Sequence, residues 1–173
     1  MNRYYVIAAL AFCIVIGAIW FFRSGDRDAR QINRRLDELV ETVEKRGNQS
    51  SLRQMTQSQA VPGFFSADAT IRMAPLYAST LGRRETAQTL YLIHNNVDRL
   101  TVRVRDRRLD INHEEGTAEM RITLTGGIHQ GGRRESYVHT FQLNWIKEDR
   151  DWFIRQVELV QAIRPPGAGP AEW

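Results

Sequence analysis

The chain lacks the residues that crosslink small secreted proteins or hold structural zinc. Its 173 residues include one cysteine, so it forms no intramolecular disulfide and no cysteine-based zinc site. It contains no G-x-S-x-G sequence and no cysteine after residue 13, which leaves no motif for a catalytic nucleophile. Hydrophobic residues make up 42% and charged residues 25% of the chain, a balance that excludes wholesale disorder. The length allows one domain with an appendage.

Long runs of one charge are also missing. The formal net charge is +4, and acidic residues are interspersed among the basic ones. The nearest basic cluster alternates with apolar residues around one predicted turn, and no aromatic residues that could stack bases are interleaved with it. It consists of Arg103, Arg105, Arg107 and Arg108. We interpret it as the solvated face of a strand and predict no nucleic-acid partner.

Charge is absent altogether from one segment near the start. Tyr4–Phe22 has no charged residue and no Asn, Gln, Pro, Ser or Thr. A helix of this length spans about 28 Å, close to the ~30 Å hydrocarbon core of a bilayer. The run is longer than the apolar region of a signal peptide, and no small-x-small cleavage site follows it. We therefore predict an uncleaved single-pass anchor over residues 1–23, embedded in the lipid bilayer of the inner membrane.

Two features predict opposite orientations of this anchor. Arg23 and four further arginines up to Arg35 follow it, whereas Arg3 alone precedes it, which favours a cytoplasmic domain under the positive-inside rule. A short Met-Asn-Arg start before an apolar run has instead the form of a signal-anchor that exports the carboxyl side. Both sides of the membrane stay open.

Three segments after the anchor show helical spacing. Residues 24–30 are predicted as a polar linker, and the helix that follows ends at Gly47. Its apolar face comprises Ile32, Leu36, Leu39, Val40 and Val43. A second, short helix is predicted after a cap at Ser50 or Ser51, with Leu52 and Met55 inward. Pro62–Gly63 ends it. A third helix is predicted over about residues 83–97. Its inward face comprises Ala87, Leu90, Tyr91, His94 and Val97.

Strands dominate the remainder. One strand is expected before the third helix, ending near Ile71, and from residue 100 the apolar period changes to two. The connections between the later strands are predicted around residues 105–108, at Glu115–Gly116, between Gly126 and Gly132, and at residues 147–151. The last strand runs over residues 152–163, and the tail from Arg164 is expected to be mobile. Helices followed by antiparallel strands predict an α+β fold, in which three helices cover a curved antiparallel sheet to form a cone with an open mouth.

Four short motifs occur in a distinctive order. They are the aromatic pair and Asp of residues 64–69, the Gly-Arg-x-Glu of residues 82–85, the hairpin of residues 112–118, and the Trp-Phe-Ile of residues 152–154. Together they resemble the nuclear transport factor 2-like superfamily, and within it the SnoaL-like and ketosteroid-isomerase-like domains, over residues 31–163. The resemblance implies the cone and a homodimer through the sheet face. It leaves function open, because members include enzymes, small-molecule binders and membrane-anchored assembly domains.

Chemistry inside the cone needs inward polar side chains. An isomerase of this fold requires an inward carboxylate base, but Asp110 and Glu119 fall on the outward phase, and Glu158 lies where the pattern shifts. Three histidines fall on apolar phases and are interpreted first as core or rim histidines, with contact to a ligand as the alternative. The candidate ligand-binding residues are His113, His139, Tyr137, His94 and Trp145. No catalytic residue, metal site or cofactor is predicted.

Two functions are compatible with these features. We expect a membrane-anchored, non-catalytic binding or assembly module whose partner is unknown. The alternative is a SnoaL-like pocket domain that binds or converts a small apolar molecule. An open apolar cavity lined by His113, His139 and Tyr137 would favour the pocket domain, and a filled cone would favour the module.

Overall fold

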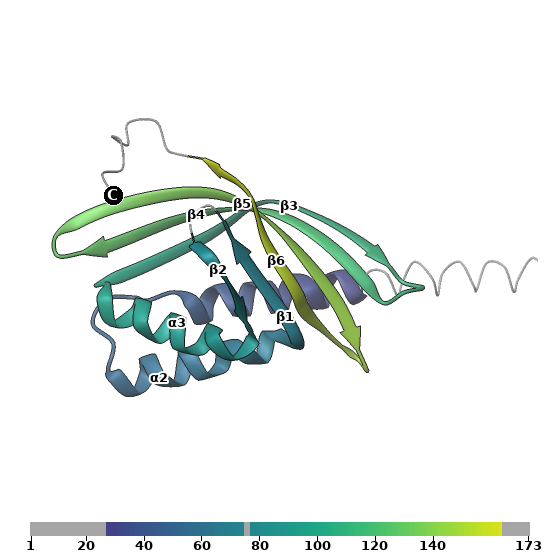
Figure 1. The fold of residues 1–173 in the computed structure, drawn as a ribbon, viewed down its shortest axis with the longest axis horizontal. Helices are drawn as coiled ribbons and strands as arrows, with labels where there is room; N and C mark the ends of the chain where they lie inside the picture. Colours follow the sequence, from purple (N-terminus) through teal and green to yellow (C-terminus); the bar gives the residue numbers. More distant parts are fainter. Residues whose placement is uncertain (1–26, 75–76, 164–173) are drawn as a thin grey trace, which may run out of the picture.

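Six strands form one strongly curved sheet, and three helices cover its concave face (Figure 1). The computed structural model describes residues 27–74 and 77–163. The first helix is described over residues 27–43, and it is followed by α2 (Ser51–Ala60), the short helix η1 (Val61–Phe64) and α3 (Arg83–Asn96). The strands are β1 (Phe65–Met73), β2 (Tyr77–Gly82), β3 (Arg99–Asn112), β4 (Thr117–Gln130), β5 (Arg133–Glu148) and β6 (Asp151–Ile163). The predicted α+β architecture is confirmed.

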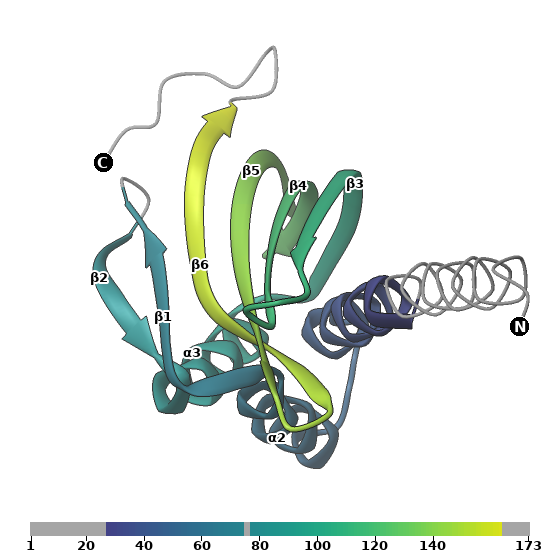
Figure 2. The same cartoon turned by 90° about the vertical axis from the view of Figure 1, so that its right-hand side faces the viewer.

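The sheet is mixed, where the sequence pattern predicts an antiparallel one. Its strand order is β2-β1-β6-β5-β4-β3, and β1 pairs with β6 in parallel while every other neighbouring pair is antiparallel. The run β3 to β6 is a meander, as the period of two and its turns predict. The parallel pairing involves the free edge of β6, the last strand of the meander. Strand β1, which precedes the meander in the sequence, pairs with that edge in the same direction. Figure 2 shows how the long strands curve over the helices.

The core lies between the first helix and the middle of the sheet. Ile32 and Leu36 of the first helix are at most 2% exposed, as the helical spacing predicts. The sheet contributes side chains that are at most 1% exposed, namely Met120, Trp145, Trp152 and Ile154. Burial of large apolar side chains stabilises a fold by roughly 1.5–3 kcal/mol each. The part of the cone around these side chains is therefore closed and filled, and we call it the base.

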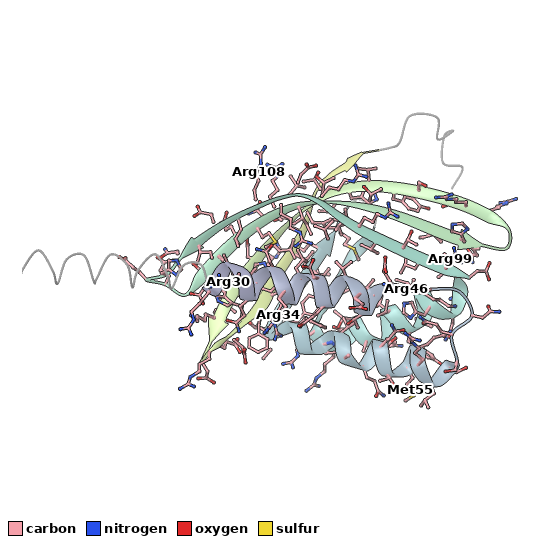
Figure 3. The ribbon with its side chains drawn as sticks, turned by 180° about the vertical axis from the view of Figure 1, so that it is seen from behind. Arg30, Arg34, Arg46, Met55, Arg99 and Arg108 are labelled. Atoms are coloured by element: carbon pink, nitrogen blue, oxygen red, sulfur yellow. The ribbon has the colours of Figure 1, made fainter. Side chains whose placement is uncertain are left out.

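The helices differ from the predictions in several places, and the first helix ends at residue 43 and not at Gly47. Residues 27–30, expected in a linker, are helical, and Asp28 is buried against the sheet. In α2 the predicted cap Ser50 accepts a hydrogen bond from the Arg53 N–H, but Leu52 and Met55 point outward. They are 75% and 50% exposed, because two apolar residues do not fix the phase of so short a helix; Figure 3 shows Met55 on the outer side.

In α3 the predicted inward face is only partly right. Leu90 and His94 are buried, but Tyr91 is 37% exposed, and Thr86 occupies the inward position one turn before Leu90. The helix begins after Gly82 as the Gly-Arg-x-Glu motif predicts, because the Glu85 carboxylate accepts a hydrogen bond from the Gly82 N–H (2.7 Å).

Three strand boundaries also differ. Strand β2 was not predicted, because its sequence shows little apolar alternation. The turn predicted around residues 105–108 is a register shift within the continuous strand β3, with Asp106 at φ 51°. Gly126 and Gly127 lie inside β4, and the connection to β5 is made by Gly131 and Gly132, which both have positive φ.

The two ends of the chain lie outside the described residues. These include the predicted anchor Tyr4–Phe22 and the tail 164–173. Within residues 27–74 and 77–163, no helix has the length and apolar character needed to cross a bilayer.

Candidate functional site

The end of the cone opposite the base holds an open groove. It has a volume of about 820 Å³ and lies between α3 and the ends of strands β1 to β5, apart from the filled base. Its apolar lining consists of Met73, Leu81, Leu92, Ile93, Val97, Leu100 and Ile128. Leu92 and Ile93 are 52% and 38% exposed, so the α3 side of this lining faces water. We call this space the mouth groove.

Helix α3 supplies the exposed side of the groove because it carries two apolar faces. Leu90 and His94 point into the core, while Leu92 and Ile93, which occupy the neighbouring face, point into the groove with Asn96. The sheet supplies the opposite side, where Leu100 of β3 pairs with Ile128 of β4. The sequence pattern does not single out these residues. The run Leu90-Tyr91-Leu92-Ile93 was the available signal, because one buried face cannot accommodate four consecutive apolar residues.

Polar groups occupy the rim of the groove on β5. Tyr137, Glu135 and Arg133 all line it, and the Tyr137 hydroxyl donates a hydrogen bond to the Glu135 carboxylate. This hydrogen bond, together with burial and the negative charge of Glu135, raises the pKa of Tyr137 to about 12. Tyr137 is therefore protonated at neutral pH and acts there as a hydrogen-bond donor.

His139 lies between the groove and the filled base. Its ring stacks on Tyr137 at 6.0 Å and meets Phe141 edge-on at 6.3 Å between ring centroids. Its Nδ1 is buried and has no hydrogen-bond partner among the described residues. Burial lowers the pKa of His139, because the charged imidazolium would lose water contacts. Burial therefore favours the neutral form of this ring beside the groove.

His94 and Trp145 belong to the packed interior. His94 is completely buried, and its Nε2 donates to the Val43 carbonyl at 2.9 Å, which ties α3 to the end of the first helix. Lys45 completes this junction, since its Nζ donates to the carbonyls of His94 and Val97, both at 2.6 Å. Trp145 is 1% exposed in the base. Neither residue is among those that line the mouth groove.

His113 lies at the far end of the sheet, beside the base. Its Nδ1 is 3.3 Å from Asp28 Oδ2, while Lys147 Nζ and Trp152 Nε1 donate to Asp28 Oδ1 at 2.8 and 3.1 Å. Burial alone would raise the pKa of Asp28, but the two hydrogen bonds and the charges of Lys147 and His113 lower it below its ordinary value. This cluster of four residues clamps the first helix onto both hairpins, and we call it the Asp28 clamp.

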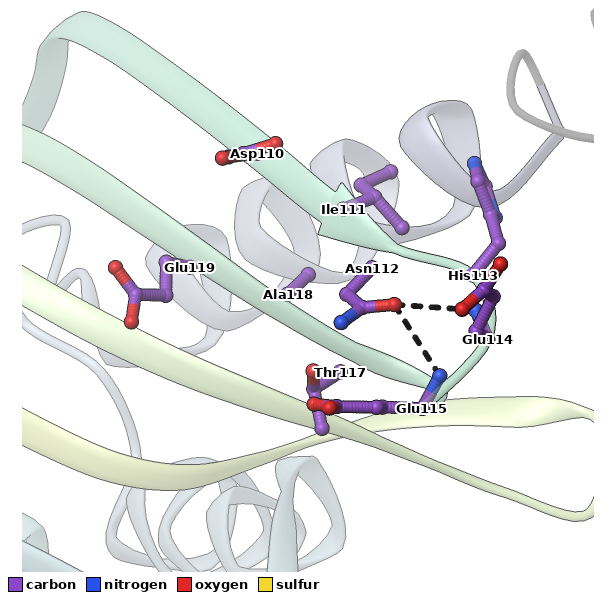
Figure 4. A pocket seen from close by; sticks show the side chains of 9 residues that line it. All are labelled: Asp110, Ile111, Asn112, His113, Glu114, Glu115, Thr117, Ala118 and Glu119. Atoms are coloured by element: carbon purple, nitrogen blue, oxygen red, sulfur yellow. Dashed lines mark hydrogen bonds between the residues drawn. The ribbon is translucent and has the colours of Figure 1, made fainter.

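The carboxylates considered for acid-base chemistry lie outside the cone. Asp110 and Glu119 face each other across β3 and β4, and both are exposed, as their strand phase predicts. They line a hollow of about 490 Å³ on the outside of the β3–β4 hairpin (Figure 4). There the Asn112 side chain accepts hydrogen bonds from the Glu114 and Glu115 amides and closes the hairpin turn. Glu158 is exposed as well.

The basic cluster of β3 is solvent-exposed at all four arginines. Arg107 pairs with Asp37 of the first helix, and Arg108 stands on the convex side of the sheet (Figure 3). Among the described residues, no group of three histidine, cysteine, aspartate or glutamate side chains is arranged to hold a metal ion.

The structure thus separates the five predicted ligand-binding residues. Tyr137 lines the mouth groove and His139 stacks against it, whereas His94 and Trp145 lie in the core and His113 lies at the base. The apolar cavity lined jointly by His113, His139 and Tyr137 does not form. A filled base and an open mouth coexist in one cone.

Comparison with known proteins identifies the fold. No family model and no curated protein matches the sequence. A candidate scytalone dehydratase from Novosphingobium aromaticivorans superposes with a TM-score of 0.63 at 18% identity, covering 86% of this chain and 99% of that one. A candidate dehydratase of the nuclear transport factor 2-like family from Streptomyces avermitilis gives 0.62 at 12% identity, with coverages of 79% and 99%.

A third similar structure belongs to the same fold type. It is a nuclear transport factor 2-like protein with a cystatin-like fold from Novosphingobium aromaticivorans, which superposes with a TM-score of 0.59 at 12% identity, covering 91% of this chain and 88% of that one. Identities this low establish architecture and not activity. The described domain therefore has the nuclear transport factor 2-like fold.

Proposed function

We propose that this domain is a non-catalytic binding module that holds an apolar molecule in the mouth groove. The observation that carries the proposal is the groove itself. Its volume of about 820 Å³ lies within the range of roughly 300–1,000 Å³ that is usual for small-molecule sites. It exposes Leu92 and Ile93 to water, and contiguous exposed apolar surface of this kind marks binding sites.

The polar rim suggests the shape of the bound molecule. Apolar side chains of α3 and the sheet would contact an apolar body, while Arg133 and the Tyr137–Glu135 pair line the same groove on β5. A guanidinium favours a carboxylate or similar anionic group. A molecule with an apolar body and one anionic end therefore fits the groove best.

The groove offers little for catalysis. A general base must be deprotonated and free to accept a proton from the substrate. Tyr137, with its pKa raised to about 12, stays protonated at neutral pH. The Glu135 carboxylate already accepts a hydrogen bond from the Tyr137 hydroxyl. The neighbouring imidazole of His139 has its Nδ1 buried. These arrangements favour binding over conversion.

A matched pair of variants tests the proposal. The full chain in lipid nanodiscs is titrated with 1-anilinonaphthalene-8-sulfonate, which has an apolar body and one anionic group, and the signal of empty nanodiscs is subtracted. Leu92→Glu introduces a charge into the groove and should weaken binding at least about tenfold. Leu52→Glu makes the same change at an exposed site outside the groove and should alter binding less than about twofold. Equal effects of the two substitutions would refute the groove as the binding site.

We also propose that Tyr4–Phe22 tethers the module to the inner membrane. The support is the length and uniform apolar character of this segment. The wild-type protein should resist extraction by alkaline carbonate, and combining Ile14→Arg with Val15→Arg should release it, since each charge costs about 2.5–3.5 kcal/mol at the bilayer centre. Protease added to intact spheroplasts then reports the side of the domain, because only an external domain is digested.

Pairing of two copies through the sheet face stays a prediction that follows from the resemblance. Sedimentation of the full chain in nanodiscs that each hold one copy, compared with larger discs, measures it directly. A single copy in every disc size would count against the dimer.

A further inference from the structure

Exposed apolar side chains are concentrated on two neighbouring helices. Among the described residues, six large hydrophobic side chains are exposed, and five of them lie on α2 and α3. These five are Leu52, Met55, Tyr91, Leu92 and Ile93, whereas the sixth, Val160, lies on β6. Exposed apolar residues scattered singly need no explanation, but their concentration on adjoining helices marks a contact surface. The mouth groove accounts for two of the five, Leu92 and Ile93, and leaves the other three unexplained.

These three residues belong to one surface, which the outer sides of α2 and α3 form together. The two helices pack against each other, and Figures 1 and 2 show them side by side, away from the convex face of the sheet. Helical spacings of three, four and seven place four exposed residues of each helix on this surface. They are Leu52, Met55, Thr56 and Gln59 of α2, and Arg84, Gln88, Tyr91 and Asn95 of α3. We call this surface the outer helix face.

The charge on these two helices is positive. Helix α2 contains no aspartate or glutamate, and the stretch without acidic residues extends over residues 45–67. The only acidic residue of α3 is Glu85, whose carboxylate accepts a hydrogen bond from the Gly82 N–H in the cap of the helix. Arg53, which follows Leu52, and Arg84 are both exposed. The exposed apolar side chains are therefore accompanied by guanidinium groups, which favour an anionic partner.

The shape of the outer helix face favours a lipid bilayer over a protein as this partner. Its apolar side chains protrude singly between polar ones, and Leu52 and Met55 are 75% and 50% exposed. A protein interface has a closely packed apolar core, so a protein partner would need a matching pocket for each protruding side chain. The fluid boundary between lipid headgroups and acyl chains accommodates such side chains without matching pockets. Tyrosine beside leucine and arginine is the usual composition of helices that lie at this boundary.

We propose that the outer helix face docks on the surface of an anionic lipid bilayer. Leu52 and Met55 enter the boundary between headgroups and acyl chains, and Tyr91 lies at the level of the headgroups. Arg53 and Arg84 pair with lipid phosphates. Docking turns the helices toward the lipid and the convex face of the sheet toward water. This inference goes beyond the proposed binding function, and it depends neither on the ligand of the mouth groove nor on the segment Tyr4–Phe22.

A fluorescent probe on α2 tests this contact. The full chain in a Cys13→Ser background carries nitrobenzoxadiazole on Thr56→Cys and is reconstituted with vesicles of equal parts phosphatidylglycerol and phosphatidylcholine. Doxyl-labelled lipid should quench this probe at least about threefold more than the same probe on Arg108→Cys, which lies on the convex side (Figure 3). In vesicles of phosphatidylcholine alone, quenching at position 56 should fall at least about twofold. Equal quenching at the two positions, or equal quenching at position 56 in both kinds of vesicle, would overturn the proposal.

A matched pair of substitutions in the labelled chain locates the contact. Leu52→Glu should reduce quenching at position 56 to the level seen at position 108, because a carboxylate is repelled by anionic headgroups. Val160→Glu makes the same kind of change at the exposed hydrophobic residue of β6 and should leave the quenching unchanged. Equal effects of the two substitutions would refute docking through α2.

Two further readouts separate this surface from the groove and from a protein partner. Leu52→Glu should lose docking and still bind 1-anilinonaphthalene-8-sulfonate, so failure of docking and failure of the groove give different results. The emission of the probe at position 56 should not depend on protein concentration. A probe that doxyl-labelled lipid does not quench, and whose emission shifts as protein concentration rises, would show that a second copy covers the outer helix face and would refute lipid docking.

Discussion

The base and the mouth of the cone are built from the same strands and differ in what those strands bury. At the base, Met120, Trp145 and Ile154 are at most 1% exposed, and the Asp28 clamp ties the first helix to two hairpins. At the mouth, the continuations of the same strands line a groove of about 820 Å³, and Leu92 of α3 is half exposed. Close packing ends roughly where His139 stacks on Tyr137.

This difference indicates a division of labour along the strands. Stability in proteins is concentrated where large side chains are packed without gaps, while binding surfaces are drawn from the less packed regions. The packed base stabilises the fold and holds β4 and β5 at a fixed distance from each other. The same distance continues to the mouth, so the apolar residues that line the groove stay apart without packing against one another. The comparison predicts that equal changes at the two ends have unequal effects.

The largest contrast is expected from truncating one large side chain at each end. Trp152→Ala at the base should lower the free energy of unfolding by about 3–5 kcal/mol, because it leaves a cavity among fully buried residues. Leu92→Ala at the mouth should change it by no more than about 0.5 kcal/mol, because the side chain is 52% exposed. Urea unfolding monitored by fluorescence and circular dichroism measures both. Similar losses for the two variants would contradict the division between base and mouth.

A smaller effect is expected from the clamp. Asp28→Ala should cost about 2 kcal/mol, because it leaves the Lys147 ammonium and the Trp152 N–H without their acceptor in a partly buried site. The control is Asp37→Ala on the same helix, whose exposed pair with Arg107 should contribute less than about 0.5 kcal/mol.

The clamp also has a pH signature with a defined sign. The pKa of Asp28 is lowered in the folded state, so its stabilising contribution is complete above its ordinary value of 3.8 and is lost as the pH falls through the lowered value. Wild type and Asp28→Ala should therefore converge in stability at strongly acidic pH. A difference that persists undiminished there would mean that Asp28 acts through packing alone.

Much of the fold follows from local patterns. The spacing of Ile32 and Leu36 predicted the buried face of the first helix, and the period of two after residue 100 predicted the meander and the outward phase of Asp110 and Glu119. These succeed because one buried face imposes one period on each element. The phase of α2 failed because Leu52 and Met55 are too few to define a face. Strand β2 failed because its pairing with β1 is fixed by tertiary contacts rather than by its own sequence.

The candidate site is harder to predict, because it depends on contacts between residues that are far apart in the sequence. The local sequence places Asp28 in a linker, because its partners Lys147 and Trp152 lie 119 and 124 residues further along the chain. The histidines share apolar phases, but a phase gives the face of a strand and not the position along it. His113 and His139 therefore share an apolar phase but lie at different positions along the cone, His113 beside Asp28 at the base and His139 against Tyr137 at the edge of the groove. Only Tyr137 among the five candidates lines the groove.

The boundary between base and mouth can be probed through His139. Burial lowers its pKa in the folded state, so the folded protein binds fewer protons than the unfolded chain as the pH falls past the ordinary histidine value of 6.5. Stability should therefore decrease between pH 7.5 and pH 5 in the wild type, and part of this decrease should vanish in His139→Gln. The control is His129→Gln, because His129 lies on the neighbouring strand β4 and on the opposite face of the sheet. Urea midpoints at both pH values give the comparison, and identical pH dependence in all three proteins would place His139 in contact with water.

The smallest expected effect is spectroscopic and confined to the rim of the groove. The hydrogen bond to Glu135 contributes most to raising the pKa of Tyr137 to about 12, so Glu135→Gln should move this pKa back toward 10. Absorbance of the tyrosinate near 295 nm, taken as the difference between wild type and variant, isolates this residue from the other four tyrosines. Stability near neutral pH should hardly change, because the rim is not part of the packed base. If the alkaline titration of the two proteins coincides, the Tyr137–Glu135 pair does not persist in solution, and the anionic end of a ligand would then meet Arg133 beside a mobile carboxylate instead of a paired one.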